Sequence, residues 1–252
     1  MISSVLLENK TIKGVVEACN VLNKIFPLLL TEVKEGRSPL YIDQLARKLC
    51  ETYEVEPAFL GQYGFPAAIC ISINNELAHG VPKGDRRFSK GDIVKLDFGV
   101  KKNGYYSDCA RSKVIGKNKK GERLIKSAIK IFNQALLAAW PEELNTTLTL
   151  HMMMKSFDEK VHIFKEFCGH SIGEQLHNGK VIYNAGPLQG AQMFYLQEGD
   201  LLCIEPIIAD KDTLVQLSDD KYTFYTDEGN ISAHHENTVL ITKKGPVVLT
   251  NF

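Results

Sequence analysis

The residues that decide the fold are 92–108, which read DIVKLDFGVKKNGYYSD. Two runs with the apolar composition of strands, 93–100 and 105–114, flank the dipeptide Asn103-Gly104, which is among the strongest signals for a two-residue hairpin turn. Each run carries one aspartate in the stretch quoted. The sequence therefore predicts an antiparallel hairpin with a carboxylate on each strand.

The position of the turn fixes how the two carboxylates face each other. If the Asn-Gly pair forms the turn, Asp97 faces Ala110, and Asp108 lies diagonal to Asp97 with about 7 Å between their backbones. A turn at residues 102–103 would place the two aspartates directly opposite each other. Both registers put them on one face of the sheet, because side chains alternate with a period of two.

Two carboxylates this close repel each other, by roughly 4 kcal/mol at 4 Å in a medium of effective dielectric about 20. They need cations or shared protons, unless the face is simply solvated, which is the usual explanation of an isolated pair. Two further acids argue against solvation here. Glu205 lies within the apolar stretch 201–206, and Glu236 leads into an apolar strand at 237–242, where an unpaired charge would be costly.

Histidine completes the set of residues that could bind metal. Residues 168–177, CGHSIGEQLH, contain His170 and His177, each of which taken alone is more often structural. Four interior carboxylates and a histidine are nevertheless typical of a metal centre, and four negative charges would balance two divalent cations. Oxygen-rich ligation with a single imidazole favours Mn, Fe, Co or Zn. Thiolate ligation by Cys168 or Cys203 is the less favoured alternative.

The composition and net charge of the chain exclude several classes of protein. The chain has 252 residues, with 30 Lys plus Arg and 30 Asp plus Glu, so no net field attracts nucleic acid or an anionic membrane. Residues 1–10 contain no basic leader, and no window reaches the ~20 apolar residues of a membrane span. The six cysteines form no Cys-x-x-Cys pair, which favours reduced thiols. We expect a cytoplasmic, monomeric protein with no nucleic-acid or membrane partner.

Apolar periodicity predicts four helices and seven strands. The first helix covers the first thirty residues and is disturbed near Pro27. The second begins with Ser38 as N-cap and Pro39 in its first turn, and two more lie at 124–135 and 148–157. Strands are expected at 68–73, 93–100, 105–114, 201–208, 222–225, 237–242 and 247–249.

The order of these elements indicates the architecture. Helix, helix and strands occur twice in succession, which suggests two similar halves. No low-complexity linker divides the chain. We therefore expect an α/β (α+β) protein in which residues 1–252 form a single domain.

Three segments ahead of the hairpin carry a resemblance to a known family. They are residues 63–66 (YGFP), 70–76 (CISINNE) and 79–82 (HGVP). Together with the acids and histidines, they closely resemble the first catalytic segment of the type I methionine aminopeptidases, and the resemblance covers essentially the whole chain. It implies the pita-bread fold, a pseudo-twofold antiparallel sheet covered by helices, in one catalytic domain.

Position by position, the resemblance also implies the site. The ligands of two divalent metal ions would be Asp97, Asp108, His170, Glu205 and Glu236. Asp108 and Glu236 would bridge the ions, and Glu205 would also carry protons between water and the leaving amine. His79 corresponds to the histidine that contacts the scissile amide, and His177 to the one that steadies the oxygen of the tetrahedral intermediate.

The resemblance implies a substrate as well. The reaction would be metal-dependent removal of the initiator methionine from nascent polypeptides with a small second residue, at the ribosome. Besides His79 and His177, the residues expected to bind substrate are Phe59, Phe65, Cys70, Leu176 and Tyr222. A thioether suits an apolar pocket of this kind, because it is flexible and packs well against aromatic edges.

The chain departs from the type I pattern at a few positions. Ser171 stands where glycine is usual, Leu176 replaces an aromatic residue, and Tyr222 stands where tryptophan is frequent. These changes bear on the shape of the pocket and remove no ligand.

Two other functions compete with this one. An Xaa-Pro aminopeptidase or prolidase would share the five ligands, but those relatives usually carry an extra N-terminal domain, and this chain reaches its first catalytic segment too early to contain one. A non-catalytic pita-bread protein that binds peptides is the second alternative. The complete set of ligands argues against it.

Overall fold

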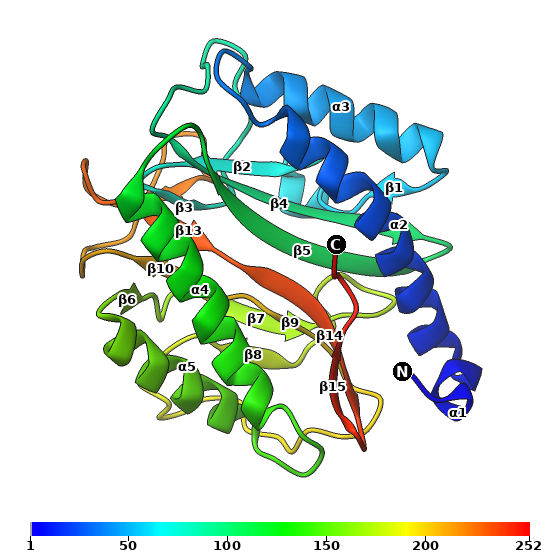
Figure 1. Cartoon of the computed structure of the whole chain (residues 1–252). Coiled ribbons are helices and arrows are strands. Elements are labelled where there is room, and N and C mark those ends of the chain that lie inside the picture. The colour runs from blue at the N-terminus through cyan, green and yellow to red at the C-terminus, as the bar shows by residue number, and fades with distance from the viewer. Residues whose placement is uncertain (1) are drawn as a thin grey trace.

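The computed structural model describes residues 2–252. Helices flank a central sheet (Figure 1). The helices are α1 (Ser4–Glu8), α2 (Lys10–Glu32), α3 (Pro39–Thr52), α4 (Lys119–Ala138) and α5 (Asn145–Glu159), with one 3-10 turn, η1 (Gln62–Gly64). The strands are β1 (Glu56–Pro57), β2 (Cys70–Ile73), β3 (Glu76–Ala78), β4 (Ile93–Lys102), β5 (Tyr105–Val114), β6 (His162–Ile163), β7 (Cys168–Ser171), β8 (Val181–Tyr183), β9 (Leu201–Ile204), β10 (Ile207–Ala209), β11 (Gln216–Leu217), β12 (Phe224–Tyr225), β13 (Ser232–His234), β14 (Glu236–Thr242) and β15 (Gly245–Val248).

The main sheet is antiparallel and contains strands from both halves of the chain. Its order is β1-β4-β5-β14-β9-β7-β8, with β2 also paired to β4 and β15 to β14. The remaining strands form two three-stranded sheets, β13-β10-β6 and β11-β12-β3. The predicted class, a mixed α/β protein with an antiparallel sheet covered by helices, is confirmed.

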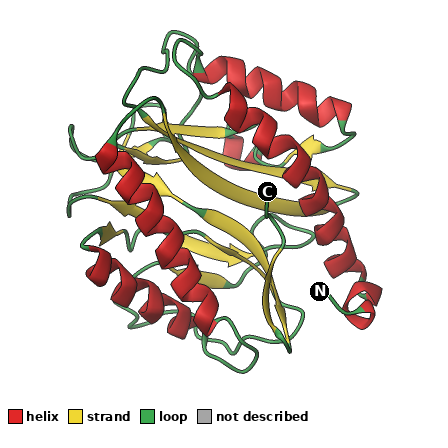
Figure 2. Ribbon diagram, in the orientation of Figure 1, coloured by secondary structure: helices red, strands yellow, loops and turns green. Residues whose placement is uncertain are grey.

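The two halves repeat the same arrangement. Figures 1 and 2 show the long helices in two pairs, α2 with α3 and α4 with α5, which lie over different parts of the main sheet. In the first half, apolar side chains of α2 such as Leu22 pack with Phe98 of β4. In the second half, Ile131 of α4 packs with Leu202 of β9. Each pair of helices thus buries an apolar face against its own strands.

The hairpin formed by β4 and β5 has the register predicted for a turn at Asn103 and Gly104. Asn103 and Gly104 form its turn with φ of 50° and 86°, and positive φ at both central residues is the requirement of a type I′ turn. Asp97 lies opposite Ala110, while Asp108 lies opposite Gly99. The two aspartates are therefore diagonal on one face.

The helix predicted for the first thirty residues is in fact two helices. Asn9 separates them, because its side chain caps α2 by accepting two backbone N–H hydrogen bonds. The expected disturbance at Pro27 is wrong, since α2 continues to Glu32. Proline removes one helical hydrogen bond, but the fully buried side chains of Phe26 and Leu29 on either side hold this turn against the core.

The other three helices are confirmed, and two of them are longer than predicted. Helix α3 begins as predicted, with the Ser38 side chain accepting a hydrogen bond from the Tyr41 backbone N–H. Helix α4 extends beyond 124–135 at both ends. Helix α5 begins at Asn145. The side-chain amide of this residue donates hydrogen bonds to the carbonyl oxygens of Val181 and Gln192.

The predicted strands differ from the structure in two informative places. The stretch 201–208 is two strands, broken at Glu205 and Pro206, because proline has no N–H to give to a ladder. His170, which lay in none of the predicted strands, is in β7. The short strands β1, β3, β6, β8, β11 and β13 were not predicted, since two or three residues cannot show an alternating pattern.

Helix α2 contradicts the expectation that no stretch of the chain is apolar enough to span a membrane. By length and composition it is apolar enough to cross a bilayer, although half of its most apolar window is buried inside the protein. Its inner face, which includes Val15, Leu22 and Ile25, is fully buried against the sheet. A core helix of this kind passes the same test, so this apolar character is explained by packing.

A glycine allows α2 to approach the hairpin closely. A Cβ atom added at Gly14 would lie 2.1 Å from the ring of Tyr105, the first residue of β5. The helix and the ring thus fill the space that a methyl group would need, and this contact sets how α2 lies across the strand that carries Asp108.

Replacing Gly14 with alanine should therefore lower the free energy of unfolding by about 1–3 kcal/mol, the usual cost of overpacking, despite the better helix propensity of alanine. Equilibrium urea denaturation measures the change. In the background Tyr105→Ala the same substitution should be neutral or stabilising, and equal destabilisation in both backgrounds would contradict the contact.

Candidate active site

The five predicted metal ligands come from neighbouring strands. Asp97 lies in β4, Asp108 in β5, His170 in β7 and Glu236 at the start of β14, while Glu205 directly follows β9. The strands β4, β5, β14, β9 and β7 are consecutive in the main sheet. Residues far apart in the sequence therefore lie side by side at the centre of the sheet.

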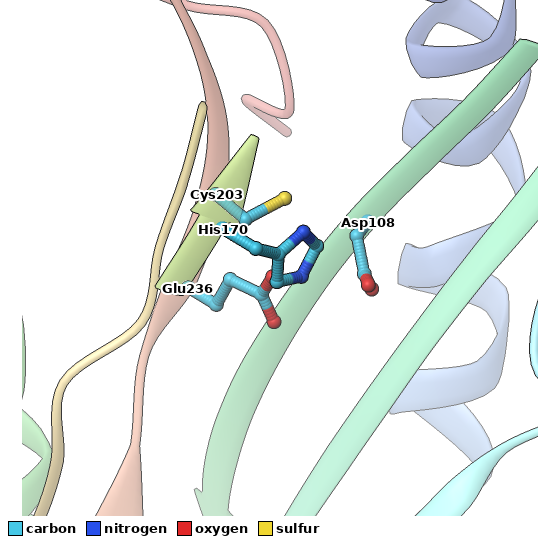
Figure 3. Close-up of side chains that lie close together, drawn as sticks. All are labelled: Asp108, His170, Cys203 and Glu236. Atoms are coloured by element: carbon cyan, nitrogen blue, oxygen red, sulfur yellow. The ribbon is translucent and has the colours of Figure 1, made fainter. Parts of the chain in front are cut away.

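Three of these side chains, Asp108, His170 and Glu236, come together with that of Cys203. Figure 3 shows Asp108 on one side and His170, Cys203 and Glu236 on the other, and one ligand atom from each of the four lies within 4.8 Å of the others. The Nε2 atom of His170 is 3.6 Å from Oε1 of Glu205. Sequence spacing predicted the proximity of the two aspartates, and the fold extends it to the second half of the chain.

Several carboxylate oxygens in this cluster have no partner within the described chain. Oδ1 of Asp97, Oδ1 of Asp108 and Oε1 of Glu236 are buried without a hydrogen bond. A buried acceptor left in this way costs about 1–3 kcal/mol, and more if it is charged. Oxygens that converge and lack donors fit divalent cations, so the residues present match a metal centre.

The same crowding changes the acidity of the carboxyl groups. Burial raises the pKa of Asp97 to about 7. Burial, followed by the neighbouring carboxylates, raises the pKa of Asp108, Glu205 and Glu236 well above the usual range. Without cations, these groups hold protons more tightly than ordinary carboxyl groups do.

His170 is held in the state that a metal ligand requires. Its Nδ1 atom lies 3.2 Å from the carbonyl oxygen of Ser171, which can only accept a hydrogen bond, so Nδ1 carries the proton. The Nε2 lone pair is then directed toward Glu205. Burial lowers the pKa of His170 to about 3, which keeps the imidazole neutral.

Two residues that support the carboxylates were missed in the sequence. The Thr238 hydroxyl accepts a hydrogen bond from the Asp108 backbone N–H at 3.1 Å and donates one to the Asp108 carbonyl at 2.8 Å. The Arg111 guanidinium donates to the Glu236 carbonyl and, at 2.9 Å, to that of Thr250. Thr238 lies two residues after Glu236 in β14 and so shares its face of the sheet, which the sequence could have indicated. The sequence around Arg111 gives no such indication.

The two histidines assigned to the substrate lie at the solvent side of the cluster. His79 follows β3 with a positive φ of 54°, and its ring contacts Phe224 edge-on. The ring of His177 contacts that of His170 at a centroid distance of 4.4 Å and stacks on Tyr63. Both residues are solvent-exposed, so a ligand entering from solvent could meet them.

The five residues expected to form the methionine pocket fall in one apolar cluster. Phe59, Phe65, Cys70 and Leu176 are buried together, and Tyr222 packs against them. The rings of Phe65 and Tyr222 meet edge to face at 5.5 Å. Cys70 is paired with Asp97 across β2 and β4, which places this cluster directly beside the carboxylates.

The cysteines are free thiols, and Cys203 and Cys168 are the two that were considered as metal ligands. Burial raises the pKa of Cys203 well above its usual range, although its Sγ is among the atoms that face Asp108 and Glu236. Cys168 is exposed at the start of β7. A neutral Cys203 thiol, 3.8 Å from the hydroxyl of Thr238, fills space beside the carboxylates.

One further histidine was not recognised in the sequence. One nitrogen of His234 and one oxygen each from Glu205 and Glu236 lie within 4.8 Å of one another. The Nε2 atom of His234 is buried without a hydrogen-bond partner in the described chain. Its position two residues before Glu236 was the signal available, because such residues share a strand face.

Comparison with known proteins agrees with this geometry. The sequence profile of metallopeptidase family M24 matches residues 13–243. A methionine aminopeptidase of Clostridium perfringens is 34% identical over 236 residues, covering 93% of this chain and 93% of the relative. One of Mycoplasma capricolum is 36% identical and covers 92% of each chain.

Solved structures show the same fold. A methionine aminopeptidase of Thermotoga maritima superposes with a TM-score of 0.91 at 26% identity, over 97% of this chain and 98% of that one. The prolidase of Pyrococcus furiosus gives 0.77 at 23% identity, over 97% of this chain but 64% of its own, and this likeness concerns the fold alone. The profile match and the relatives together show that the chain belongs to metallopeptidase family M24.

Proposed function

We propose that the chain is a methionine aminopeptidase, which removes the N-terminal initiator methionine from nascent proteins and peptides with a small second residue. The observation that carries the proposal is the group of buried, unpartnered oxygens on Asp97, Asp108 and Glu236, next to His170 and Glu205. A purely structural core would not gather like charges in this way. The names of the curated relatives support the choice of substrate.

The metal centre would hold two divalent cations, drawn from Mn, Fe, Co and Zn. Their ligands would be Asp97, Asp108, His170, Glu205 and Glu236, with Asp108 and Glu236 shared. Such cations, when bound, supply a water of lowered pKa and polarise a peptide carbonyl. Four ionised carboxylates would offset the charge of two divalent ions, which explains why the protein keeps so many acids in its interior.

Glu205 would move the proton. Its carboxyl group lies beyond the end of β9, where Pro206 ends the strand, and it contacts His170 at 3.6 Å. A carboxyl group whose pKa is raised by burial can accept a proton from the attacking water and then give it to the leaving amine. Glu205 would thus combine ligand and general-base roles.

His79 and His177 would bind the reacting peptide. Both rings border the solvent side of the cluster, and His177 contacts the metal-facing ring of His170. Imidazole N–H groups placed there can donate to the scissile amide and to the oxygen that becomes negative in the transition state. These donors stabilise the transition state more than the ground state.

Methionine would be selected by the apolar cluster beside Asp97. Phe59, Phe65, Cys70, Leu176 and Tyr222 provide two phenyl rings, a phenol, a thiol and an isobutyl group. The Tyr222 hydroxyl donates to the Gly64 carbonyl at 2.8 Å, which leaves its ring to face the cluster. A flexible thioether packs well against aromatic edges of this kind.

The nearest competing function is that of a proline-directed peptidase. The prolidase shares the fold, but at 23% identity this likeness does not indicate which substrate the chain cleaves. The relatives with 34% and 36% identity bear the name methionine aminopeptidase. The complete set of five ligands also favours an enzyme over a non-catalytic binding protein.

The setting of the enzyme is part of the proposal. We propose that residues 1–252 form one catalytic domain, because the main sheet takes strands from both halves. The protein would act as a cytoplasmic monomer on the N-termini of nascent chains at the ribosome. The formal net charge of zero supports neither nucleic-acid nor membrane binding.

The first test removes a shared ligand. Asp108→Ala and Glu236→Ala should each lower the rate of methionine release from a Met-Ala-Ser peptide by more than about 100-fold, because even the loss of an outer-shell partner costs 10–100-fold. Circular dichroism should show both variants to be folded. The exposed Glu228 provides the control, Glu228→Ala, which should keep the wild-type rate. Wild-type rates in either ligand variant would refute the assignment.

The second test uses pH and metal removal. Between about pH 7.5 and 9 the histidines of the unfolded chain, with an ordinary pKa of about 6.5, are largely neutral. In the folded protein, burial raises the pKa of Asp97 to about 7 and that of Asp108 and Glu236 well above the usual carboxyl range. A folded-state pKa above the unfolded value means that stability is lost as pH rises through this window. The chelated protein should lose up to ~1.4 kcal/mol per pH unit for each such group.

Thermal melts of chelated protein across this window measure the effect. Excess Mn²⁺ should remove the slope, and Asp108→Asn should reduce it without metal. A stability that is flat or rises with pH in the chelated wild type would contradict a cluster of protonated, buried carboxyl groups.

The third test addresses substrate choice. The enzyme should release methionine from Met-Ala-Ser and Met-Pro-Ser, and it should leave Leu-Pro-Ser intact, because the apolar cluster, and not the second residue, selects the first. A bulky second residue, as in Met-Leu-Ser, should slow release. Faster cleavage of Leu-Pro-Ser than of Met-Ala-Ser would favour the proline-directed alternative.

A further inference from the structure

A second imidazole faces the carboxylate cluster, and the five proposed ligands do not account for it. His234 ends β13 and is 2% exposed, so its ring is as deeply buried as Glu236. Its Nε2 atom has no hydrogen-bond partner among the described residues. A buried polar nitrogen without a partner is uncommon and calls for an explanation.

The backbone of His234 is held in place by the side chain of Ser112. The Ser112 hydroxyl donates to the His234 carbonyl at 2.8 Å and accepts from its N–H at 2.9 Å, which fixes the residue against β5. His234 and Glu236 are two residues apart and share a face. The intervening His235 points elsewhere, because its ring packs against Phe132 of α4.

The distances distinguish ligation from hydrogen bonding. Nε2 of His234 lies 3.9 Å from Oε2 of Glu236, which is too long for a hydrogen bond. Two atoms that bind one ion at about 2.0–2.2 Å each can be separated by up to about 4.3 Å. An oxygen of Glu205 belongs to the same group, with all three atoms within 4.8 Å of one another.

The electrostatic surroundings point the same way. Carboxyl oxygens of Glu205 and Glu236 lie close to a nitrogen of His234, and its Nε2 atom has no hydrogen-bond partner among the described residues. A cation between the three groups would neutralise the carboxylates and use the nitrogen lone pair at once. Neutral imidazole is a good ligand for Zn, Fe and Co, whereas carboxylates alone suit Mn as well.

We propose that His234 is an additional metal ligand, which donates Nε2 to the divalent cation held between Glu205 and Glu236. This inference rests on the proposed metallopeptidase function and deepens it. The site would then contain two imidazoles, from His170 and His234. The second nitrogen ligand would shift metal preference from Mn²⁺ toward Co²⁺, Zn²⁺ and Fe²⁺, in line with the general order of affinities.

Metal binding by the full chain tests the proposal. The wild type and the variants His234→Gln, His170→Gln and His235→Gln would be freed of metal and titrated with Co²⁺ and with Mn²⁺ by calorimetry. His234→Gln should weaken Co²⁺ binding by at least about tenfold and Mn²⁺ binding by less. His235→Gln is the matched control, since its ring faces α4, and it should bind both ions as the wild type does.

Proton NMR of the Co²⁺-loaded proteins counts the imidazole ligands directly. The wild type and His235→Gln should each show two strongly shifted, exchangeable imidazole N–H resonances, whereas His234→Gln and His170→Gln should each retain one. A wild type with a single such resonance, lost in His170→Gln, would overturn the proposal, and this holds even if His234→Gln fails to fold. Equal Co²⁺ affinity in the wild type and a folded His234→Gln would overturn it as well.

These outcomes are separable from failure of the proposed function. A wild type that binds neither ion and releases no methionine would refute the metallopeptidase assignment itself. A wild type that binds two ions and cleaves Met-Ala-Ser, with one shifted imidazole resonance, would refute the role of His234 alone.

Discussion

The mutual repulsion of buried carboxylates is the constraint on which the rest of the structure depends. Asp97, Asp108, Glu205 and Glu236 are delivered by consecutive strands of one sheet, and three of them keep buried oxygens without partners. The favourable packing of two apolar cores must offset this cost in the absence of cations. Backbone supports such as Thr238 and Arg111 hold the strands in place, so the side chains cannot relax by moving apart.

Part of this arrangement could be predicted from the sequence, because it depends on local rules. The Asn103-Gly104 turn and the alternation of the hairpin strands gave the diagonal placement of Asp97 and Asp108, which the register confirms. Ser38 and Pro39 likewise marked the start of α3. Acids inside apolar strands also pointed to Glu205 and Glu236. The resemblance to the methionine aminopeptidases added what the local pattern left open, namely the separate roles proposed for His170 and His177.

Other features depend on tertiary contacts and could not be predicted locally. Pro27 stays within α2 because the buried residues beside it outweigh one lost hydrogen bond. Strand β7 was missed, because its glycine, Gly169, reads as a turn signal, although it serves to let the strand approach the Cys203 carbonyl closely. For His234 the strand parity with Glu236 was a local signal, but only the fold brings it to Glu205.

The pairing of β5 with β14 has a consequence for how the enzyme could be adjusted. Within the main sheet these two strands join the halves of the chain, through Ala110 opposite Glu236 and Cys109 opposite Asn237. Asp97 and Asp108 lie on one side of this junction, whereas His170 and Glu205 lie on the other. Any small rotation of one half relative to the other would alter the spacing between the carboxyl groups on the two sides. The junction therefore determines the geometry available to the proposed metal centre, and substitutions there could tune reactivity without replacing a single proposed ligand.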